Sequence, residues 1–571
     1  MREHAWNSLW GIEELAGKLV DLVEAAGNAA IIDATAATKE PTAASSPWAP
    51  LRIGVFRVLW LTTLVDFTGN WFQTVGAQWL LIDEPHASIL VALVQTATAL
   101  PFVLFGLIGG VLADTLDRRW LMFSVQAAMT AVGALLAALT FSGQIPPTLL
   151  LLLVFLLGTG IALTTPAYQS LVPDLVSRSE IPAAAALNSI SVNLARVVGP
   201  AVAGALVASA GVGTTFTVAA ATSACYATVL LLWRRPPPPR PTPEPFVAAL
   251  RAGGRYVEHA PVVRRILLRA GLFLVPASSL FALLPLIASR QLGLGAGGYG
   301  FLLAAIGVGA ISGVLLLPKV RTRLSLNLMI AAASGLYVAV FAAIALLHDV
   351  VLVLVLLVPA GAAWVVVLST VNAALQLFLP GWVRGRSLAL YQTVLFGSQA
   401  LGALLFGLLA AGVGLSAALL TAAGVTALGV ATMRPWPFID TSDMDRSPVA
   451  YWPEPLIAAD VSPEGRTVFV SVTYAVSEDD QPAFVERMAR VRESRLRTGA
   501  TSWGLYQQGE DGRSFVEMFA VASWEEHLRQ HDERLTGTDR DYQESVERLS
   551  ESPPEVRHLI SVAVPGASRR I

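Results

Sequence analysis

The sequence predicts an all-α polytopic membrane protein that carries a small α+β domain at its C-terminal end. Of its 571 residues, 54% are hydrophobic and only 14% are charged, against about 25% charged residues in an average soluble domain. Apolar stretches of about 20 residues, the length that spans a bilayer as a helix, recur from Phe56 to Met433. This composition argues against an ordinary soluble enzyme.

Twelve apolar stretches are expected to be membrane-spanning helices in two groups of six. They cover residues 56–81, 88–112, 120–141, 147–172, 183–210, 214–233, 266–289, 298–317, 326–347, 350–372, 386–410 and 414–432. The first half occupies residues 46–235 and the second half residues 264–433. Residues 236–263 form a Pro/Arg-rich linker between the halves, since its prolines exclude a helix interior.

The charges of the loops predict the orientation. Basic residues gather in the loops of one side, namely Arg52, Arg57, Arg118, Arg119, Arg178, the linker, Lys319, Arg321, Arg323, Arg384, Arg386 and Arg434. Among the opposite loops only Arg290 is basic. The positive-inside rule therefore places both termini and the linker in the cytoplasm.

Residues 1–45 form an N-terminal extension with one amphipathic stretch. Its apolar residues are spaced alternately three and four apart, as on one helix face: Leu9, Ile12, Ala16, Leu19, Val23 and Ala26. The opposite face is acidic. This segment is either a helix that binds a partner or lies on a surface, or a loosely ordered extension.

The residues after Met433 predict a tether and a separate cytoplasmic domain. Residues 434–466 form the tether, and residues 467–565 form the domain. Its expected elements are a strand at 468–476, a helix at 482–497, a hairpin ending at Val521, a helix capped by Ser523 and Glu526, a helix at 539–550 and a strand at 557–564. Strand, helix, hairpin, helix and strand in this order indicate a ferredoxin-like α+β domain.

Two ionisable residues lie well inside predicted spans, Asp66 in the first and Arg196 in the fifth. Charges at bilayer depth are costly and usually functional, so both are candidates for proton coupling. Counting residues along each helix puts both near the midplane, within about 5 Å of it. An unpaired charge at that depth is costly, so we expect each to be paired or in a water-filled cavity. A static ion pair that fixes the two helices is the alternative.

Three stripes of polar residues are candidates for lining a substrate cavity. Each follows one helix face: Asn70 and Gln73 beside Asp66, Ser189 and Asn193 beside Arg196, and Ser369, Asn372 and Gln376 in the tenth span. Polar stripes on apolar spans must face protein or a water-filled cavity. Hydrogen bonding between helices without a substrate role is the alternative.

The loop between the second and third spans, from Gly110 to Arg119, resembles the G-x-x-x-D-R-x-G-R-R motif of the major facilitator superfamily. It keeps Gly110, Asp114, Arg118 and Arg119 but has Thr115 and Asp117 where the motif has Arg and Gly. The resemblance implies the twelve-helix major facilitator fold, six plus six. It also implies that Asp114 caps the start of the eleventh span, near Arg384 and Arg386, in the outward-open state.

The fifth span from Arg196 to Gly204 is similar to the later part of the antiporter motif of that superfamily. Residues 46–564 as a whole resemble the bacterial "transmembrane secretion effector" branch, which includes enterobactin exporters. The segments that carry the resemblance are 46–52, 188–204, 384–386, 499–503, 523–531 and 556–558. The tail resembles the antibiotic-biosynthesis monooxygenase-like dimeric α/β barrel, which implies that it can dimerise.

His527 and His531 lie four apart on one predicted helix, a spacing that can hold one metal ion. The sequence places no third ligand, so we expect no metal and assign the pair to the surface or to dimer packing. No catalytic residues and no nucleotide-binding G-x-x-x-x-G-K-[ST] stretch are identifiable, so we expect no cofactor and no enzyme. The tail is interpreted as a regulatory or dimerising module.

The leading hypothesis is a secondary active transporter of the bacterial inner membrane. It would export a small amphipathic molecule, such as a siderophore, macrolide or other drug, by proton-coupled alternating access. Its expected partners are this cargo, protons and the lipid bilayer, without nucleic acid. One alternative is an importer or ligand sensor on the same fold. Another makes the tail a monooxygenase that modifies cargo.

Overall fold

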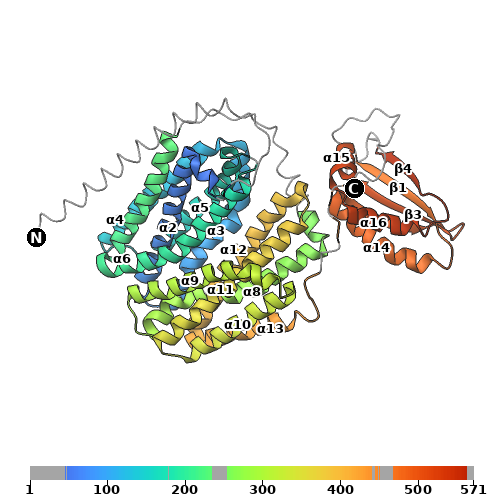
Figure 1. The fold of residues 1–571 in the computed structure, drawn as a ribbon. Helices are drawn as coiled ribbons and strands as arrows, with labels where there is room; N and C mark the ends of the chain where they lie inside the picture. Colours follow the sequence, from blue (N-terminus) through green and yellow to red (C-terminus); the bar gives the residue numbers. More distant parts are fainter. Residues whose placement is uncertain are drawn as a thin grey trace, which may run out of the picture. The chain divides into compact units, whose positions relative to one another are not determined.

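Figure 1 shows the computed structural model of the chain. It describes residues 46–561 apart from 47, 178, 234–253, 440–443, 446, 448 and 450–466. The N-terminal extension 1–45, Arg178, most of the linker and most of the tether therefore lie outside the described residues. So do the side chains of Asp114, Arg384 and Arg386.

The first half is a bundle of long helices that follows a short 3-10 turn, η1 (Ala49–Arg52). Its helices are α2 (Gly54–Leu80), α3 (Ala87–Thr115), α4 (Arg118–Phe141), α5 (Pro147–Leu175) and α6 (Ile181–Leu232). The last of these contains two predicted spans. They separate at Gly211, whose φ of 84° and ψ of 168° break the helix and are accessible to glycine at little cost.

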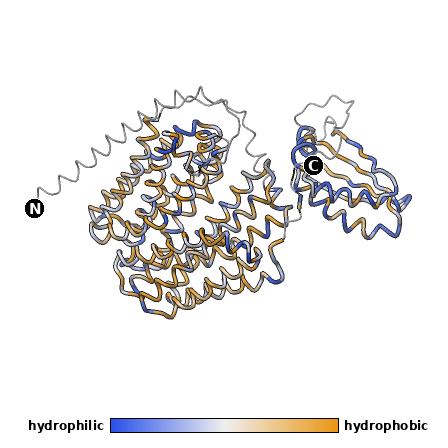
Figure 2. The backbone as a smooth tube through the Cα atoms, viewed as in Figure 1, coloured by the Kyte–Doolittle hydropathy of each residue, from blue (hydrophilic) through white to orange (hydrophobic). Residues whose placement is uncertain are grey.

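The second half repeats this pattern with apolar helices joined by short turns. Its elements are α8 (Pro261–Leu286), the π turn η2 (Ile287–Gln291), α9 (Ala296–Arg321), α10 (Leu326–Leu346), α11 (Val350–Phe378), α12 (Gly381–Val413) and α13 (Leu415–Ala431). Figure 2 shows that hydrophobic residues dominate the helices of the bundle. Their backbone groups can form hydrogen bonds within each helix, as apolar surroundings demand.

A helix lies at each of the twelve predicted ranges. Nine helices among the described residues are long and apolar enough to cross a membrane, and one of these is the broken α6. α2 and α13 are not among them; α13 has only 17 residues. The polytopic helical class is therefore confirmed, while the crossing of the bilayer by all twelve segments stays a prediction.

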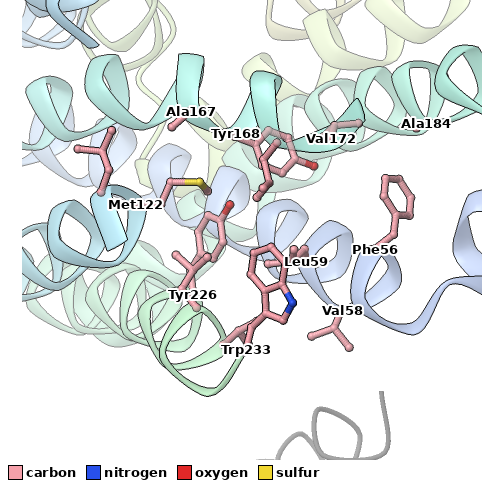
Figure 3. Close-up of a cluster of buried hydrophobic side chains, with 14 of the residues drawn as sticks. Phe56, Val58, Leu59, Met122, Ala167, Tyr168, Val172, Ala184, Tyr226 and Trp233 are labelled. Carbon is pink, nitrogen blue, oxygen red and sulfur yellow. The ribbon is translucent and has the colours of Figure 1, made fainter. Parts of the chain in front are cut away.

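A cluster of buried side chains joins the helices of the first half near one of their ends. Phe56 and Leu59 of α2, Met122 of α4, Tyr168 of α5 and Tyr226 of α6 belong to it. Figure 3 shows these aromatic and apolar side chains together with Trp233. The cluster holds the ends of five helices, α2 to α6, against one another, because separating them would expose its apolar surface.

The C-terminal domain is a four-stranded antiparallel sheet with helices against one face. The strands β1 (Val468–Ala475), β2 (Ala500–Gln507), β3 (Ser514–Val521) and β4 (Glu555–Ile560) lie in the order β2-β3-β1-β4. Alternate residues of β1 are buried against Phe484 and Met488 of α14 (Gln481–Thr498) and Val546 of α16 (Gly537–Glu547). The predicted order of strands and helices in this domain is the observed order.

The predicted cap of the helix after Ser523 is partly confirmed. The Ser523 hydroxyl accepts a hydrogen bond from the backbone N–H of Glu526 at 3.2 Å, at the start of α15 (Trp524–Arg529). The Glu526 carboxylate does not complete a capping box, because it accepts from Arg534 Nη1 at 2.7 Å. The complete capping box belongs to Thr536 and Asp539, at the start of α16.

A buried ion pair lies between the sheet and its helices. Arg495 of α14 and Glu517 of β3 are 2% and 0% exposed, and Arg495 Nε donates to Glu517 Oε1 at 3.0 Å. Trp503 Nε1 donates to the same oxygen at 2.8 Å. Burial alone would lower the pKa of Arg495, but the adjacent Glu517 carboxylate raises it. The pair is therefore charged, and each partner neutralises the other.

We predict that Glu517→Gln destabilises the C-terminal domain by about 3–5 kcal/mol, since it leaves the Arg495 charge buried without its counter-ion. Hydrogen exchange of the peptides covering β1 and β3 in the full chain measures this loss.

Glu478→Gln is the matched control. Glu478 is exposed and lies 3.9 Å from Arg513, so its loss should cost less than about 1 kcal/mol. Equal exchange rates in the two variants would contradict the prediction.

Candidate functional site

Asp66 is a buried carboxylate in the helical bundle. It lies on α2, is 4% exposed, and accepts a hydrogen bond from Ser223 Oγ at 3.2 Å and another from Gln126 Nε2 at 3.3 Å. Ser223 belongs to the second part of α6 and Gln126 to α4. Asp66 therefore links three helices of the first half through neutral donors.

The predicted pair between Asp66 and Arg196 is not formed. Arg196 is half-buried on the first part of α6, and no ion pair of Arg196 is found within the described chain. Asp66 instead meets Ser223, which lies on the other arm of α6 beyond the break at Gly211. Depth along the helix could be counted from the sequence, but the rotation of α2 that aims Asp66 depends on packing.

The polar stripe next to Asp66 includes atoms that lack partners. Asn70 Oδ1 and Gln73 Nε2 are buried, and neither has a hydrogen-bond partner among the described residues. Buried polar groups are normally paired, and each exception needs an explanation. We infer that water or a bound molecule supplies the hydrogen-bond partners of these two atoms.

The other two stripes satisfy part of their hydrogen bonding within their own helices, and Ser369 also receives a donor from a neighbouring helix. Asn193 Nδ2 donates to the carbonyl of Ser189 at 2.8 Å. On α11, Gln376 Nε2 donates to Asn372 Oδ1 at 3.1 Å. The carbonyl of Ser369 accepts from Arg321 Nη2 at 3.3 Å. Their role in lining a cavity stays a prediction.

The arginines of the motif-like loop hold the first half together. Arg118 Nη1 donates to Asp174 Oδ2 at 2.7 Å and to the carbonyl of Ser170 at 3.0 Å, at the end of α5. Arg119 donates to the carbonyls of Leu230 and Leu231, both at 2.7 Å, at the end of α6. Cations are favourable at helix C-termini, where carbonyls lack intrahelical donors.

Asp117, which departs from the motif, has a local role. Its Oδ1 accepts from the backbone N–H of Trp120 at 3.1 Å and caps α4. Gly110 has open space beside it, since a Cβ there would meet nothing within 4 Å. The predicted contact of Asp114 with Arg384 or Arg386 lies outside the described residues.

The two halves approach closely where α6 crosses α9. A Cβ on Gly204 would lie 2.7 Å from the carbonyl oxygen of Ala296, and one on Gly300 would lie 2.9 Å from that of Pro200. One on Gly307 would lie 2.7 Å from the Cα of Val197. Only residues without a side chain permit this separation of the two backbones.

α3 and α12 form the second junction between the halves. The rings of Phe102 and Phe396 stack with centroids 3.8 Å apart, and Thr96 Oγ1 donates to the carbonyl of Ala400 at 3.1 Å. A Cβ on Gly407 would lie 2.3 Å from the Cβ of Ala92. Both junctions run from the middle of the helices to the ends at which α3 and α9 begin. The halves are therefore packed together at that end.

Three functional candidates were missed in the sequence. Gln126 and Ser223 were not assigned to Asp66, although a polar residue on an otherwise apolar span was the available signal. Arg269 is 5% exposed on α8 and donates to the carbonyl of Gly429 and the hydroxyl of Thr432, both at 2.9 Å. Arg269 is the fourth residue of the predicted span 266–289, so it does not bear on the prediction that only Asp66 and Arg196 lie well inside spans.

Comparison with protein families gives a match over almost the whole chain. The model of the family described as "Transmembrane secretion effector" matches residues 45–566. The staphyloferrin A transporter of Staphylococcus aureus is 27% identical over 264 residues, which are 44% of this chain and 64% of that protein. The enterobactin exporter EntS of Shigella boydii is 31% identical over 264 residues, 46% of this chain and 62% of that protein. The chain thus spans less than two thirds of the length of each.

Solved structures show the fold alone, because their identity is low. A bacterial homolog of the human lysosomal transporter Spinster has a TM-score of 0.53 and 18% identity, over 67% of this chain and 96% of that one. The nucleoside transporter NupG has a TM-score of 0.55 and 13% identity, over 67% and 99%. The chain is a multi-pass membrane protein with the helical transporter fold of the major facilitator type, and it belongs to the transmembrane secretion effector family.

Proposed function

We propose that the chain is a secondary active transporter that exports a small amphipathic molecule by proton-coupled alternating access. The observation that carries the proposal is Asp66, a carboxylate buried in a bundle of two halves and bound by the neutral donors Ser223 and Gln126. An ionised carboxylate among apolar helices without a cation is costly. Taking up a proton removes that cost, so the site can exchange protons as its surroundings change.

The names of the relatives support a siderophore as the cargo. One is a staphyloferrin A transporter and another an enterobactin exporter. A macrolide or another amphipathic drug is the second class of cargo. Asn70 and Gln73 lie on the face of α2 that carries Asp66, so their unpartnered atoms would meet polar groups of such a molecule.

The basic residues in the loops of one side support an orientation in the bacterial inner membrane with both termini in the cytoplasm. In that orientation the packed end of the bundle, where Gly204 meets Gly300, faces away from the cytoplasm. We assign this packed end to the state that takes up cargo from the cytoplasm, because alternating access requires the outer end to be closed in that state. The predicted contact of Asp114 belongs to the opposite, outward-open state.

We assign the C-terminal domain a regulatory or dimerising role on a ferredoxin-like arrangement. The antiparallel strand order β2-β3-β1-β4 supports this assignment. The named relatives are a transporter and an exporter, which does not favour a cargo-modifying enzyme. Inside-out vesicles separate export from import, because an exporter accumulates cargo in them when a proton gradient is imposed.

We predict that Asp66→Asn abolishes gradient-driven accumulation of siderophores or amphipathic dyes in inside-out vesicles, yet leaves exchange down the cargo gradient measurable. The amide keeps the volume of the side chain but cannot carry the proton. Asp83→Asn, in an exposed loop, is the matched control and should transport normally. Cargo concentration by Asp66→Asn against its gradient would show that the carboxylate is structural.

We predict that Gly300→Ala shifts the bundle away from the packed state. The added Cβ would press on the carbonyl of Pro200, an overpacking that costs about 1–3 kcal/mol. Labelling of a cysteine introduced at this end, with Cys225 replaced by Ser, measures the shift. Gly297→Ala is the control, because its Cβ would meet only the Cβ of Ala208, at 3.8 Å. Equal labelling of the two variants would refute the proposed opening.

We predict that Asp114→Asn lowers turnover more than expression, because the contact it removes biases a conformational equilibrium without filling a core. Initial rates of transport, normalised to the protein present in the membrane, measure the effect. An outward-open structure in which Asp114 points into bulk water, far from the start of α12, would disprove the predicted contact.

A further inference from the structure

Three histidines from distant parts of the C-terminal domain come together in the structure. His527 lies on α15, His531 on the π turn η3 (Gln530–Arg534) that continues it, and His558 on β4. The sequence led us to expect no metal site, because no third ligand could be placed beside His527 and His531. Pairing of β4 with β1 brings His558 to them. Of the two roles expected for His527 and His531, the surface one does not hold, since they are only 1% and 7% exposed; dimer packing stays a prediction.

The distances between the three rings suit ligands of one small ion. The centroid of His527 lies 4.5 Å from that of His531 and 4.9 Å from that of His558. One nitrogen from each ring can be chosen so that all three lie within 4.8 Å of one another. Nitrogens bound to one tetrahedral Zn²⁺ at about 2.0–2.1 Å are roughly 3.4 Å apart. Binding would draw these nitrogens together by rotation of the three side chains.

The cluster contains nitrogen atoms that the domain leaves without partners. Neither ring nitrogen of His527 has a hydrogen-bond partner among the described residues, and neither does Nε2 of His558. The neighbouring Gln530 Nε2 donates elsewhere, to Thr498 Oγ1 at 2.8 Å and the carbonyl of Arg495 at 3.4 Å. A buried imidazole with both nitrogens unsatisfied is unfavourable by itself. A bound ion would satisfy one nitrogen of His527 and one of His558.

The electrostatic surroundings favour neutral rings, which are the form that binds metals. Burial lowers the pKa of His527 to about 3 and that of His531 to about 4, and it also lowers the pKa of His558. Arg495 contributes to the shifts of His527 and His531, but Glu517 neutralises most of its charge. Trp524 covers the cluster, with its ring centroid 5.2 Å from His527 and 5.6 Å from His558.

We propose that His527, His531 and His558 form a binding site for a divalent transition metal ion of the Zn²⁺, Co²⁺ or Ni²⁺ class. Imidazole suits these ions, whereas Mg²⁺ and Ca²⁺ prefer oxygen ligands. Three histidines leave a coordination position for water or another ligand. His558 is only half-buried and gives the ion a route from the surface.

The site would clamp the edge of the sheet. Among the described strands, β4 lies at the edge of the sheet and pairs only with β1. An ion held by His558 would tie it to α15 and η3. An ion that binds only the folded domain stabilises it by an amount that grows with the logarithm of the ion's concentration once this exceeds the dissociation constant. The order of this domain would then respond to cellular metal. This inference depends neither on the direction of transport nor on the cargo.

The test uses the full chain in detergent, with any affinity tag removed and the protein treated with a chelator. Titration with Co²⁺ should give the visible absorption of a low-symmetry nitrogen site, saturating at one ion per chain. Zn²⁺ should displace the Co²⁺ and slow hydrogen exchange in β4. In His558→Gln, Co²⁺ affinity should fall at least tenfold and Zn²⁺ should no longer protect β4.

His348→Gln, in an exposed loop of the bundle, is the matched control and should bind as the unaltered chain does. Unchanged secondary structure by circular dichroism shows that His558→Gln still folds. His531→Gln supplies a second variant with the same expected loss. The proposal fails if the unaltered chain binds no stoichiometric ion or if His558→Gln binds ions equally well. It also fails if phosphate slows hydrogen exchange in β4 and metal ions do not, since the cluster would then be an anion site.

Discussion

Apolar surroundings without water constrain the whole bundle, because every backbone N–H and C=O must find its partner within the chain. Along its length a helix pairs these groups with one another. At its ends, side chains form hydrogen bonds with the backbone groups that remain. Arg118 and Arg119 donate to the last carbonyls of α5 and α6, and Arg269 donates to those at the end of α13. Arg118, Arg119 and Arg269 thus complete backbone hydrogen bonding at the ends of helices.

Asp66 and the glycine contacts do not serve this backbone hydrogen bonding. Asp66 is buried with neutral donors only, whereas the equally buried Glu517 of the C-terminal domain has a guanidinium as partner. The first arrangement suits a group that changes its charge, and the second suits a permanent pair. Gly204 and Gly300 allow the halves to meet without interlocking side chains. A contact of this kind can open without disrupting a core.

Much of this fold could be predicted because its signals are local. Runs of apolar residues mark the helices, and alternation from Val468 to Val476 marks a strand, whatever their neighbours. Partners of single side chains were harder to predict. Asp66 was matched to Arg196 by depth and by the neighbouring helices of the superfamily fold, but Ser223, beyond the break of α6 at Gly211, donates to it instead. The third histidine was missed for the same reason, since β4 reaches α15 only through its pairing with β1.

The sequence by itself determined the membrane class, the two halves, the order of the elements and the polar residues within them. These depend on hydrophobicity and periodicity, which each segment carries alone. Only the tertiary structure decided which side chains meet: Asp66 with Gln126, Gly204 with Gly300, and His558 with His527. Such contacts depend on how each helix is rotated and how each strand is paired. Packing of the whole chain sets those variables, because one rotation or one step in register moves every side chain to another face.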